Sequence, residues 1–315
     1  MIEVEGLTKY FGTVPGIKNV TFKVNRGEIL GFLGPNGAGK TTTMRILTCY
    51  IAATSGLARI AGFDVYENSL EVRRRVGYLP ESVPLYLEMM VKDYLLFVSS
   101  LKGVPRNKKE SHVREIISQC SLEAVESRVI RHLSKGYRQR VGIAQALVGN
   151  PDVLILDEPT VGLDPKQIIE IRELIKKLAG RCTIILSTHI LPEVQMTCEK
   201  VIIINKGSIV AVDTPEKLQD RLDQANEMFL RVQGPRDSVI NALNNVNGVT
   251  SVSSGEAVAN DIFSLNVKTS KDMEIRSLLA KTVVDNGWGL YEMKPVKLSL
   301  EDIFVKLVTK EEEVN

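Results

Sequence analysis

Apolar residues in the first part of the chain fall in short runs separated by glycine. The runs "IEVEGL" (2–7), "VTFKV" (20–24) and "EILGFLG" (28–34) have the apolar or alternating composition of β-strands. The third run ends in a glycine-rich turn, and the segment that follows it, "KTTTMRILTCY" (40–50), has a helical pattern. The pattern therefore predicts the local order strand, glycine loop, helix.

The spacing of apolar residues becomes helical from about residue 89 to 150. Two amphipathic segments, "VKDYLLFVSSLKG" (91–103) and "SHVREIISQCSL" (111–122), flank a polar stretch. Three short aliphatic strands are then predicted, in "DVLILDEP" (152–159), "CTIILSTH" (182–189) and "KVIIINKGSIV" (200–210). They alternate with helical segments at 166–180 and 190–198. Strands that alternate with helices predict an α/β fold with a mostly parallel sheet covered on both faces.

The composition shifts after "TPEKLQDRLDQANE" (214–227), which has the pattern of a helix and a linker. We interpret the remainder as a separate small α+β domain. Its predicted segments are "MFLRVQG" (228–234), "RDSVINALNNV" (236–246), "VTSVSS" (249–254), "DIFSLNVKT" (261–269), "MEIRSLLAKTVVDNG" (273–287) and a final "SLEDIFVKLV" (299–308). A length of 315 residues agrees with about two domains.

Composition and charge limit the function classes. With 44% hydrophobic residues, 25% charged residues and a net charge of +2, the chain has the balance of an ordinary globular protein rather than a nucleic-acid binder. Within that balance, the arginine run at 73–75 is more simply a solvated helix face. The four cysteines form no Cys-x-x-Cys pair and the start lacks a signal-peptide pattern, so we expect a reducing cytoplasm. No apolar run approaches the roughly 18 residues of a membrane helix, so a membrane-crossing segment is expected only in another chain.

The strongest chemical signal is "GPNGAGKT" (34–41), which fits the pattern G-x-x-x-x-G-K-[ST] between an apolar strand and a helix. Glycines in such a loop let backbone N–H groups surround a polyphosphate. Lys40 is expected to reach the terminal phosphates, and the Thr41 hydroxyl to coordinate Mg²⁺. A flexible turn with an exposed lysine is the alternative, and the flanking strand and helix disfavour it.

A second signal is "VLILDEP" (153–159), four aliphatic residues followed by two carboxylates. At the carboxyl edge of a sheet, Asp157 can hold Mg²⁺ through its water shell. Glu158, one residue further, can face the γ-phosphate and orient the attacking water or accept its proton. The alternative is that both acids cap the turn before Pro159.

In their order and spacing these motifs resemble the ATP-binding subunits of ABC transporters, over residues 1 to about 220. The loop at 34–41 corresponds to Walker A and "VLILDEP" to Walker B. The family's signature, D-loop and switch correspond to "LSKGY" (133–137), "VGLD" (161–164) and "STH" (187–189). The resemblance implies a P-loop ABC ATPase cassette at 1–220, with a mostly parallel core sheet, an antiparallel β subdomain and a helical subdomain at about 82–150. Residues 221–315 are then a linker and an accessory α+β domain.

The resemblance also implies ATP and Mg²⁺ as ligands, with Glu158 and His189 as catalytic residues. The metal-binding residues that it implies are Thr41, Asp157 and Glu81. The implied nucleotide-binding residues are Phe11, Asn36, Gly37, Ala38, Gly39, Lys40, Thr41, Thr42, Ser134, Gly136 and Asp164.

Single residues leave alternatives open. Phe11 lies where the family places an aromatic against adenine, but Tyr10 could serve or either could be core. Asp164 could equally cap the helix after Pro165. His189 alone would be read as a structural histidine, but an aliphatic strand precedes it and can bring its ring to the sheet edge.

Departures from the family pattern narrow the subfamily. Glu81 stands where the family usually has glutamine, which leaves its contact with the metal in question. In the signature, Ser134 and Gly136 are kept while Lys135 and Tyr137 replace a glycine and a glutamine. With "YLPE" (78–81) and "LSLEDIFVKL" (298–307), these features look like the ABC-2 type, whose members export drugs, polysaccharides or lipids, or serve gliding motility.

The implied mechanism is a head-to-tail dimer with a second copy or a paralogous ATPase subunit. Each ATP lies between the P-loop of one chain and the signature of the other. The dimer would drive a separate integral membrane permease in the direction of export, placing the chain at the inner face of the cell membrane with no nucleic-acid partner. We expect the coupling surface at 82–95, unless those residues pack the subdomain's own core. Other classes are a soluble ABC ATPase that acts on ribosomes or nucleic acid, and a regulatory nucleotide switch.

Overall fold

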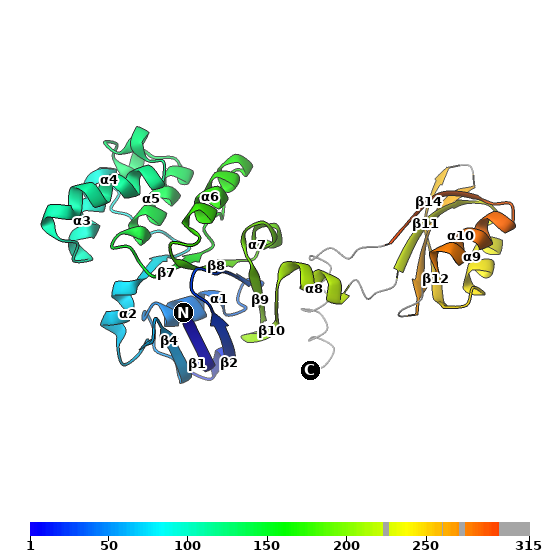
Figure 1. Cartoon of the computed structure of the whole chain (residues 1–315), viewed down its shortest axis with the longest axis horizontal. Helices are drawn as coiled ribbons and strands as arrows, with labels where there is room; N and C mark the ends of the chain where they lie inside the picture. The colour runs from blue at the N-terminus through cyan, green and yellow to red at the C-terminus, as the bar shows by residue number, and fades with distance from the viewer. Residues whose placement is uncertain (223–226, 260, 271–274, 296–315) are drawn as a thin grey trace. The chain divides into compact units, whose positions relative to one another are not determined.

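A computed structural model describes residues 1–222, 227–259, 261–270 and 275–295. The chain divides into two compact units, the first formed by Met1–Pro215 and the second beginning at Glu216. Figure 1 shows the elements of both units along the chain. The predicted segment at 299–308 lies outside the described residues.

A six-stranded sheet forms the centre of the first unit, in the order β10-β9-β3-β8-β7-β6. Its strands are β3 (Ile29–Leu33), β6 (Val76–Leu79), β7 (Val153–Asp157), β8 (Thr183–Thr188), β9 (Lys200–Asn205) and β10 (Ser208–Asp213). All neighbours are parallel except β10, which runs antiparallel to β9. Every residue of β3, β7 and β8 is buried, as expected for a sheet covered on both faces. The predicted α/β fold with a mostly parallel sheet is therefore confirmed.

The stretch 200–210 folds as two strands joined by a tight turn. Lys206 and Gly207 take the left-handed conformation, with φ of 44° and 83°, so the chain reverses between β9 and β10. The turn also holds the glycine loop after β3, because the Gly207 N–H donates to the carbonyl of Ala38 at 3.0 Å.

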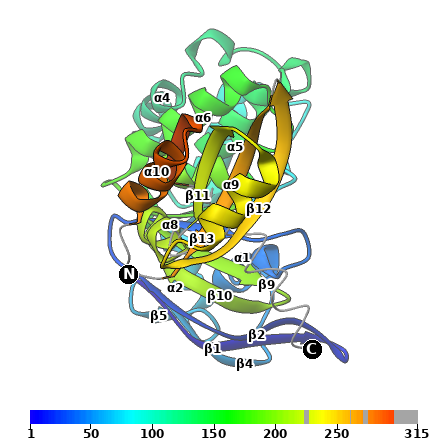
Figure 2. The ribbon, with the colours of Figure 1, turned by 90° about the vertical axis from the view of Figure 1, so that its right-hand side faces the viewer.

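An antiparallel sheet completes this unit, in the order β2-β1-β4-β5. Its strands are β1 (Ile2–Phe11), β2 (Val14–Val24), β4 (Ser55–Ile60) and β5 (Phe63–Asp64), so the first two are longer than predicted. It shares a core with the central sheet and with α1 (Lys40–Leu47), in which the rings of Phe22 and Phe32 lie 5.7 Å apart. In both views the antiparallel sheet lies on the opposite side of the central sheet from the helical subdomain (Figures 1 and 2).

The helical subdomain contains α3 (Val91–Leu101), α4 (Lys109–Gln119) and α5 (Lys135–Leu147), in agreement with the helical pattern from residue 89. Short 3-10 turns at Arg106–Lys108, Glu123–Val125 and Ile130–His132 connect them. The remaining helices of the unit are α2 (Ser69–Arg75), α6 (Pro165–Leu178) and α7 (Leu191–Thr197), and α8 (Pro215–Leu222) begins at its boundary. Within the described ranges, no helix has both the length and the apolar character needed to cross a membrane.

The second unit has the chain order strand, helix, two strands, helix, strand. Its elements are β11 (Glu227–Gln233), α9 (Arg236–Asn244), β12 (Val249–Ala259), β13 (Ile262–Thr269), α10 (Arg276–Asp285) and β14 (Gly289–Pro295). The sheet order β12-β13-β11-β14, all antiparallel, is that of ferredoxin-like domains. Met228 on β11 pairs with Pro295 on β14, so the first and last strands have their outer ends side by side.

Candidate active site

The loop between β3 and α1 requires glycine at two positions. Gly37 and Gly39 take φ values of 79° and 106°, which L side chains rarely adopt. A Cβ on Gly39 would also come within 2.8 Å of the Gly16 carbonyl oxygen. Gly39 is the N-cap of α1 and offers no capping side chain, so the first N–H groups of the helix are available to an anion.

A cavity of about 360 Å³ lies at the carboxyl edge of the central sheet. It is lined by Gly16, Asn36, Gly37, Gly39, Lys40, Thr41, Thr42, Glu81, Glu158, Val161 and His189. The structure thus brings together predicted residues that are distant in sequence, because parallel strands end at the same edge. Ala38 is instead buried, and its N–H donates to the Pro35 carbonyl at 3.2 Å.

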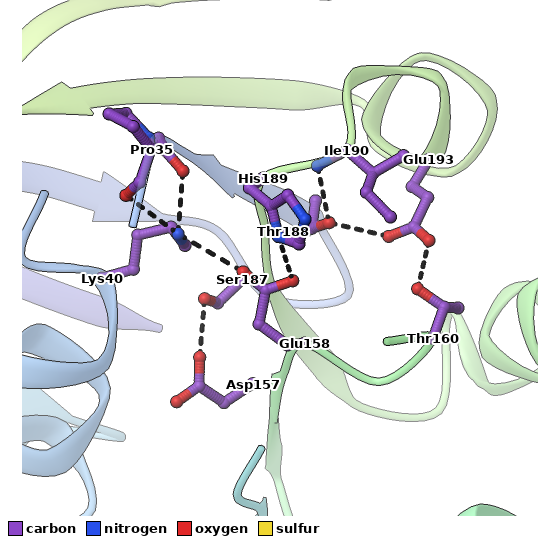
Figure 3. Close-up of polar contacts among 11 residues, drawn as sticks. Pro35, Lys40, Asp157, Glu158, Thr160, Ser187, Thr188, His189, Ile190 and Glu193 are labelled. Atoms are coloured by element: carbon purple, nitrogen blue, oxygen red, sulfur yellow. Dashed lines mark hydrogen bonds and ion pairs between the residues drawn. The ribbon is translucent and has the colours of Figure 1, made fainter. Parts of the chain in front are cut away.

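Lys40 and Glu158 form a buried ion pair (Figure 3). Lys40 Nζ lies 3.3 Å from Glu158 Oε1, and each side chain is 6% exposed. The same ammonium group donates to the carbonyls of Gly34 and Pro35 at 2.8 and 3.2 Å. The other oxygen of Glu158 lies 2.9 Å from His189 Nδ1. Glu158 is therefore held between a cation and an imidazole.

The backbone at Glu158 is strained. Its φ of 52° lies in the left-handed region, which is uncommon for a residue with a side chain. The conformation is held from the neighbouring strand, because the Glu158 N–H donates to the Ser187 carbonyl at 2.9 Å. In this conformation the Glu158 carboxylate lines the cavity, whereas Asp157 is buried beside Ser187.

Asp157 is fully buried and lacks one partner. Ser187 donates to its Oδ1 at 2.7 Å, but Oδ2 has no hydrogen-bond partner among the residues that the structure describes. Burial raises the pKa of Asp157; the hydroxyls of Ser187 and Thr41 oppose this rise, and the carboxylates of Glu158 and Glu81 add to it. A buried, unpaired carboxylate oxygen beside a hydroxyl and further acids fits a hard divalent cation such as Mg²⁺. Thr41 and Asp157 are the residues that would hold it, with Glu81 at the same cavity.

Phe11 and Tyr10 differ in what they face. Both are largely exposed, at 51% and 42%, so neither is a core residue. A Cβ on Gly16 would lie 2.8 Å from the Phe11 ring and 3.4 Å from the Thr42 methyl group. The Phe11 ring therefore lies against Gly16, a residue of the cavity wall. Tyr10, the residue before Phe11 on β1, points to the other face of the strand.

The signature residues Ser134 and Gly136, and Asp164 of the D-loop, lie outside this cavity in the same chain. Ser134 caps α5 by accepting from the Tyr137 N–H at 3.3 Å, and Asp164 caps α6 by accepting from the Gln167 N–H at 2.9 Å. Gly136 lies against α6, since an added Cβ would meet Gln167 Cδ at 2.6 Å. The described residues that line the cavity include none from the stretch 131–140.

Four further polar residues at this edge were not predicted. Ser187 supports Asp157, and a buried glutamate, Glu193, accepts hydrogen bonds from Thr160 and Thr188. The hydroxyls of residues 187 and 188 interrupt an aliphatic strand, which is the signal that could have identified them. Glu193 follows Pro192 in the first turn of a helix, where an acid ordinarily stays in solvent, so nothing in the sequence indicated its burial.

The ABC transporter family profile matches residues 17–161. The chain is 33% identical to the bacitracin transport ATP-binding protein BcrA of Bacillus licheniformis, over 98% of this chain and 97% of that protein. It is 30% identical to the ABC transporter ATP-binding protein YxlF of Bacillus subtilis, over 98% and 99% of the two chains.

Solved structures agree with these relatives. The ATP-binding subunit of an ABC transporter superposes with a TM-score of 0.64 at 30% identity, over 70% of this chain and 93% of that one. The dimeric cassette MJ0796 in a post-hydrolysis state with ADP and Pi gives 0.62 at 25% identity, over 68% and 98%. The sequence similarity to BcrA and YxlF extends over nearly the whole of both chains, which a shared P-loop alone would not produce, so this chain belongs to the ABC transporter ATP-binding proteins and is an ATPase of that family.

Proposed function

We propose that this chain is the ATPase subunit of an ABC-2 type exporter, in which two copies close on two ATP molecules and drive a separate membrane permease. One observation carries the dimer. The P-loop, Glu158 and His189 line one cavity, whereas Ser134 and Gly136 of the signature lie outside it. A second chain, facing the first head to tail, supplies the missing donors: the N-terminus of its α5 and the Ser134 hydroxyl.

Within each site the residues divide the chemistry of phosphoryl transfer. Lys40 neutralises the terminal phosphates, and the Glu158 carboxylate orients the attacking water and accepts its proton. The neutral imidazole of His189 has one N–H, so this residue can fix the Glu158 carboxylate through Nδ1 or donate to the γ-phosphate, but it cannot do both at once. When bound at Thr41 and Asp157, Mg²⁺ supplies charge neutralisation of the phosphate oxygens. Loss of the γ-phosphate removes an anion that both chains bind, which favours opening of the dimer.

The permease-docking site in this proposal is an apolar groove in the first unit. The groove has a volume of about 820 Å³, and its aromatic lining includes Tyr50, Tyr78, Tyr86, Tyr94 and Phe97. Segment 82–95 contributes to it in part: Val91 and Leu95 are buried in the subdomain, whereas Tyr86 is 55% exposed. A groove of this kind accepts an amphipathic helix, and a permease helix is the occupant that fits an ATP-binding protein of transporters. Binding there would place the chain at the inner face of the membrane.

Dimer formation is tested with Glu158→Gln, which keeps the side-chain size and removes the base. With Mg-ATP this variant should elute as a stable dimer in size-exclusion chromatography, and with ADP as a monomer. A second change, Ser134→Ala in the same background, should weaken the dimer. Persistent monomer with Mg-ATP would refute the two-chain site.

The permease is tested by purification of the tagged chain from detergent-solubilised membranes of its own cell. An integral membrane protein should copurify with the wild type and be lost in Tyr86→Ala, which removes an aromatic ring from the groove. Tyr66→Ala is the matched control, since Tyr66 is 71% exposed and does not line the groove. Recovery of ribosomes or DNA in place of a membrane protein would contradict the transporter assignment.

A further inference from the structure

Glu193 is a buried acid that connects two segments of the active site. It lies in the first turn of α7 and is only 2% exposed. One carboxylate oxygen accepts a hydrogen bond from the Thr160 hydroxyl, and the other accepts one from the Thr188 hydroxyl at 2.8 Å. Figure 3 shows Glu193 between these two threonines, beside the pair formed by Glu158 and His189. We call this arrangement of three side chains the Glu193 bridge.

Each end of the Glu193 bridge lies within two residues of a member of the catalytic pair. Thr160 follows Glu158 by two residues, and Thr188 directly precedes His189. The Thr188 hydroxyl also accepts from the Ile190 N–H at 3.0 Å, so it fixes the backbone on both sides of His189. The Glu193 carboxylate therefore adds a buried connection between the Glu158 segment and the His189 segment, beyond the hydrogen bond from the Glu158 N–H to the Ser187 carbonyl.

Burial makes this connection strict. An acid removed from water needs a donor on each oxygen, and both donors here are themselves buried hydroxyls. If either threonine moved away, a carboxylate oxygen would be left without a partner. The bridge thus resists any change in the distance between Thr160 and Thr188.

The residues next to the bridge are strained or exposed. Glu158 has the strained φ of 52°, and the His189 side chain is 42% exposed. Thr160 also begins the turn toward the D-loop, because its carbonyl accepts from the Leu163 N–H at 3.1 Å. We propose that Glu193 is a positioning residue of the ATPase, which acts through Thr160 and Thr188 to hold Glu158, His189 and the start of the D-loop in one arrangement. This inference rests on the ATPase activity and is independent of the permease.

The test uses Glu193→Ala and Glu193→Gln in the full chain. Glu193→Ala removes both contacts, and we expect kcat to fall about 10- to 100-fold with little change in KM for ATP, as for a misplaced reacting group. Glu193→Gln can still span the two threonines, because its amide donates to the Thr160 oxygen and its carbonyl accepts from Thr188. We expect it to restore kcat to within about threefold of the wild type, the gain over Glu193→Ala being the contribution of the bridge.

Thr197→Val is the matched control on the same helix. Thr197 is also buried, but its hydroxyl has no hydrogen-bond partner within the described ranges, so the substitution leaves the Glu193 bridge intact. Its kcat should equal that of the wild type. Thr160→Val removes one end of the bridge, so as a single substitution it should lower kcat. In the Glu193→Ala background it should cause no further fall in kcat.

Steady-state ATPase rates of the purified chain are measured against ATP concentration, well below the Tm of each variant. A Glu193→Ala protein that is less stable yet keeps the wild-type kcat would overturn the proposal, as would Glu193→Gln being as slow as Glu193→Ala. If Glu193→Ala does not fold, Thr160→Val decides, and an unchanged kcat there would refute the positioning role. The assay contains no permease, so its outcome is distinct from that of the copurification test.

Discussion

The ion pair between Lys40 and Glu158 makes a quantitative prediction about stability. We consider Lys40→Met and Glu158→Gln, separately and combined, since both substitutions keep the side-chain length and remove the charge. The double-mutant cycle isolates the interaction between the two side chains. Loss of the Lys40 hydrogen bonds to the Gly34 and Pro35 carbonyls occurs with either residue at 158 and therefore cancels in the cycle.

The magnitude follows from the geometry. At a separation of 3.3 Å and an effective dielectric constant of about 20, Coulomb's law gives roughly 5 kcal/mol for the attraction. Loss of Lys40 from the wild type leaves a carboxylate that is 6% exposed without its cation, whereas loss of Lys40 from the Glu158→Gln protein leaves no carboxylate to strand. Relaxation and water entry in the single variants reduce the difference, so we expect a coupling free energy of about 2 to 3 kcal/mol.

Urea unfolding of the four proteins without nucleotide measures this coupling, followed by circular dichroism at 222 nm. The chain provides an internal control, because its single tryptophan, Trp288, packs on the core of the second unit. Tryptophan fluorescence should therefore show the same transition in all four proteins. A coupling free energy below about 0.5 kcal/mol would refute a strong interaction between the two charges.

The other predictions concern single residues at the same edge of the sheet. Folding raises the pKa of Asp157, so the folded protein loses stability relative to the unfolded chain as the pH rises above 3.8, the ordinary pKa of this group. Asp157→Asn should therefore be more stable than the wild type in urea unfolding at pH 7. A gain in stability that persists below pH 3.8 would contradict this cause. Gly136→Ala should lower the ATPase rate more than about tenfold. If the clash with Gln167 causes this loss, the double variant Gly136→Ala with Gln167→Ala should recover the wild-type rate. If the rate does not recover, position 136 must be small because it approaches the ATP bound to the partner chain. Phe11→Ala should weaken ATP binding about tenfold through lost stacking while Tyr10→Ala should not, and equal losses in a fluorescent-nucleotide titration would contradict the placement of Phe11.

The central sheet and the position of the P-loop could be predicted because both depend on local pattern. Runs such as "VLIL" are stable when buried in a sheet, and the glycines at 37 and 39 adopt positive φ angles that a glycine-rich loop already indicates. Once the strands are parallel, the residues after their carboxyl ends must meet. The cavity shared by Lys40, Glu81, Glu158 and His189 follows from that geometry.

Features that depend on contacts between distant segments could not be predicted. The burial of Glu193 results from two threonines that precede it by 33 and 5 residues, and no local pattern indicates such a contact. The turn at Lys206 and Gly207 reverses an apolar stretch that resembles one strand, and β14 has too few apolar residues to stand out. Within one chain, Ser134 and Asp164 each cap a helix, which accounts for their positions. The anion expected at Ser134 belongs to a second chain, so a single chain cannot contain that contact.

The pairing of β11 with β14 bears on how the second unit could have been acquired. Because Met228 on the first strand pairs with Pro295 on the last described strand, the two ends of the segment 227–295 lie side by side. A domain with that property can be added to, or removed from, a chain without rerouting the rest of the polypeptide. The second unit is therefore suited to exchange as a whole, and a graft of residues from Glu227 to Pro295 onto another cassette would preserve its own strand pairing.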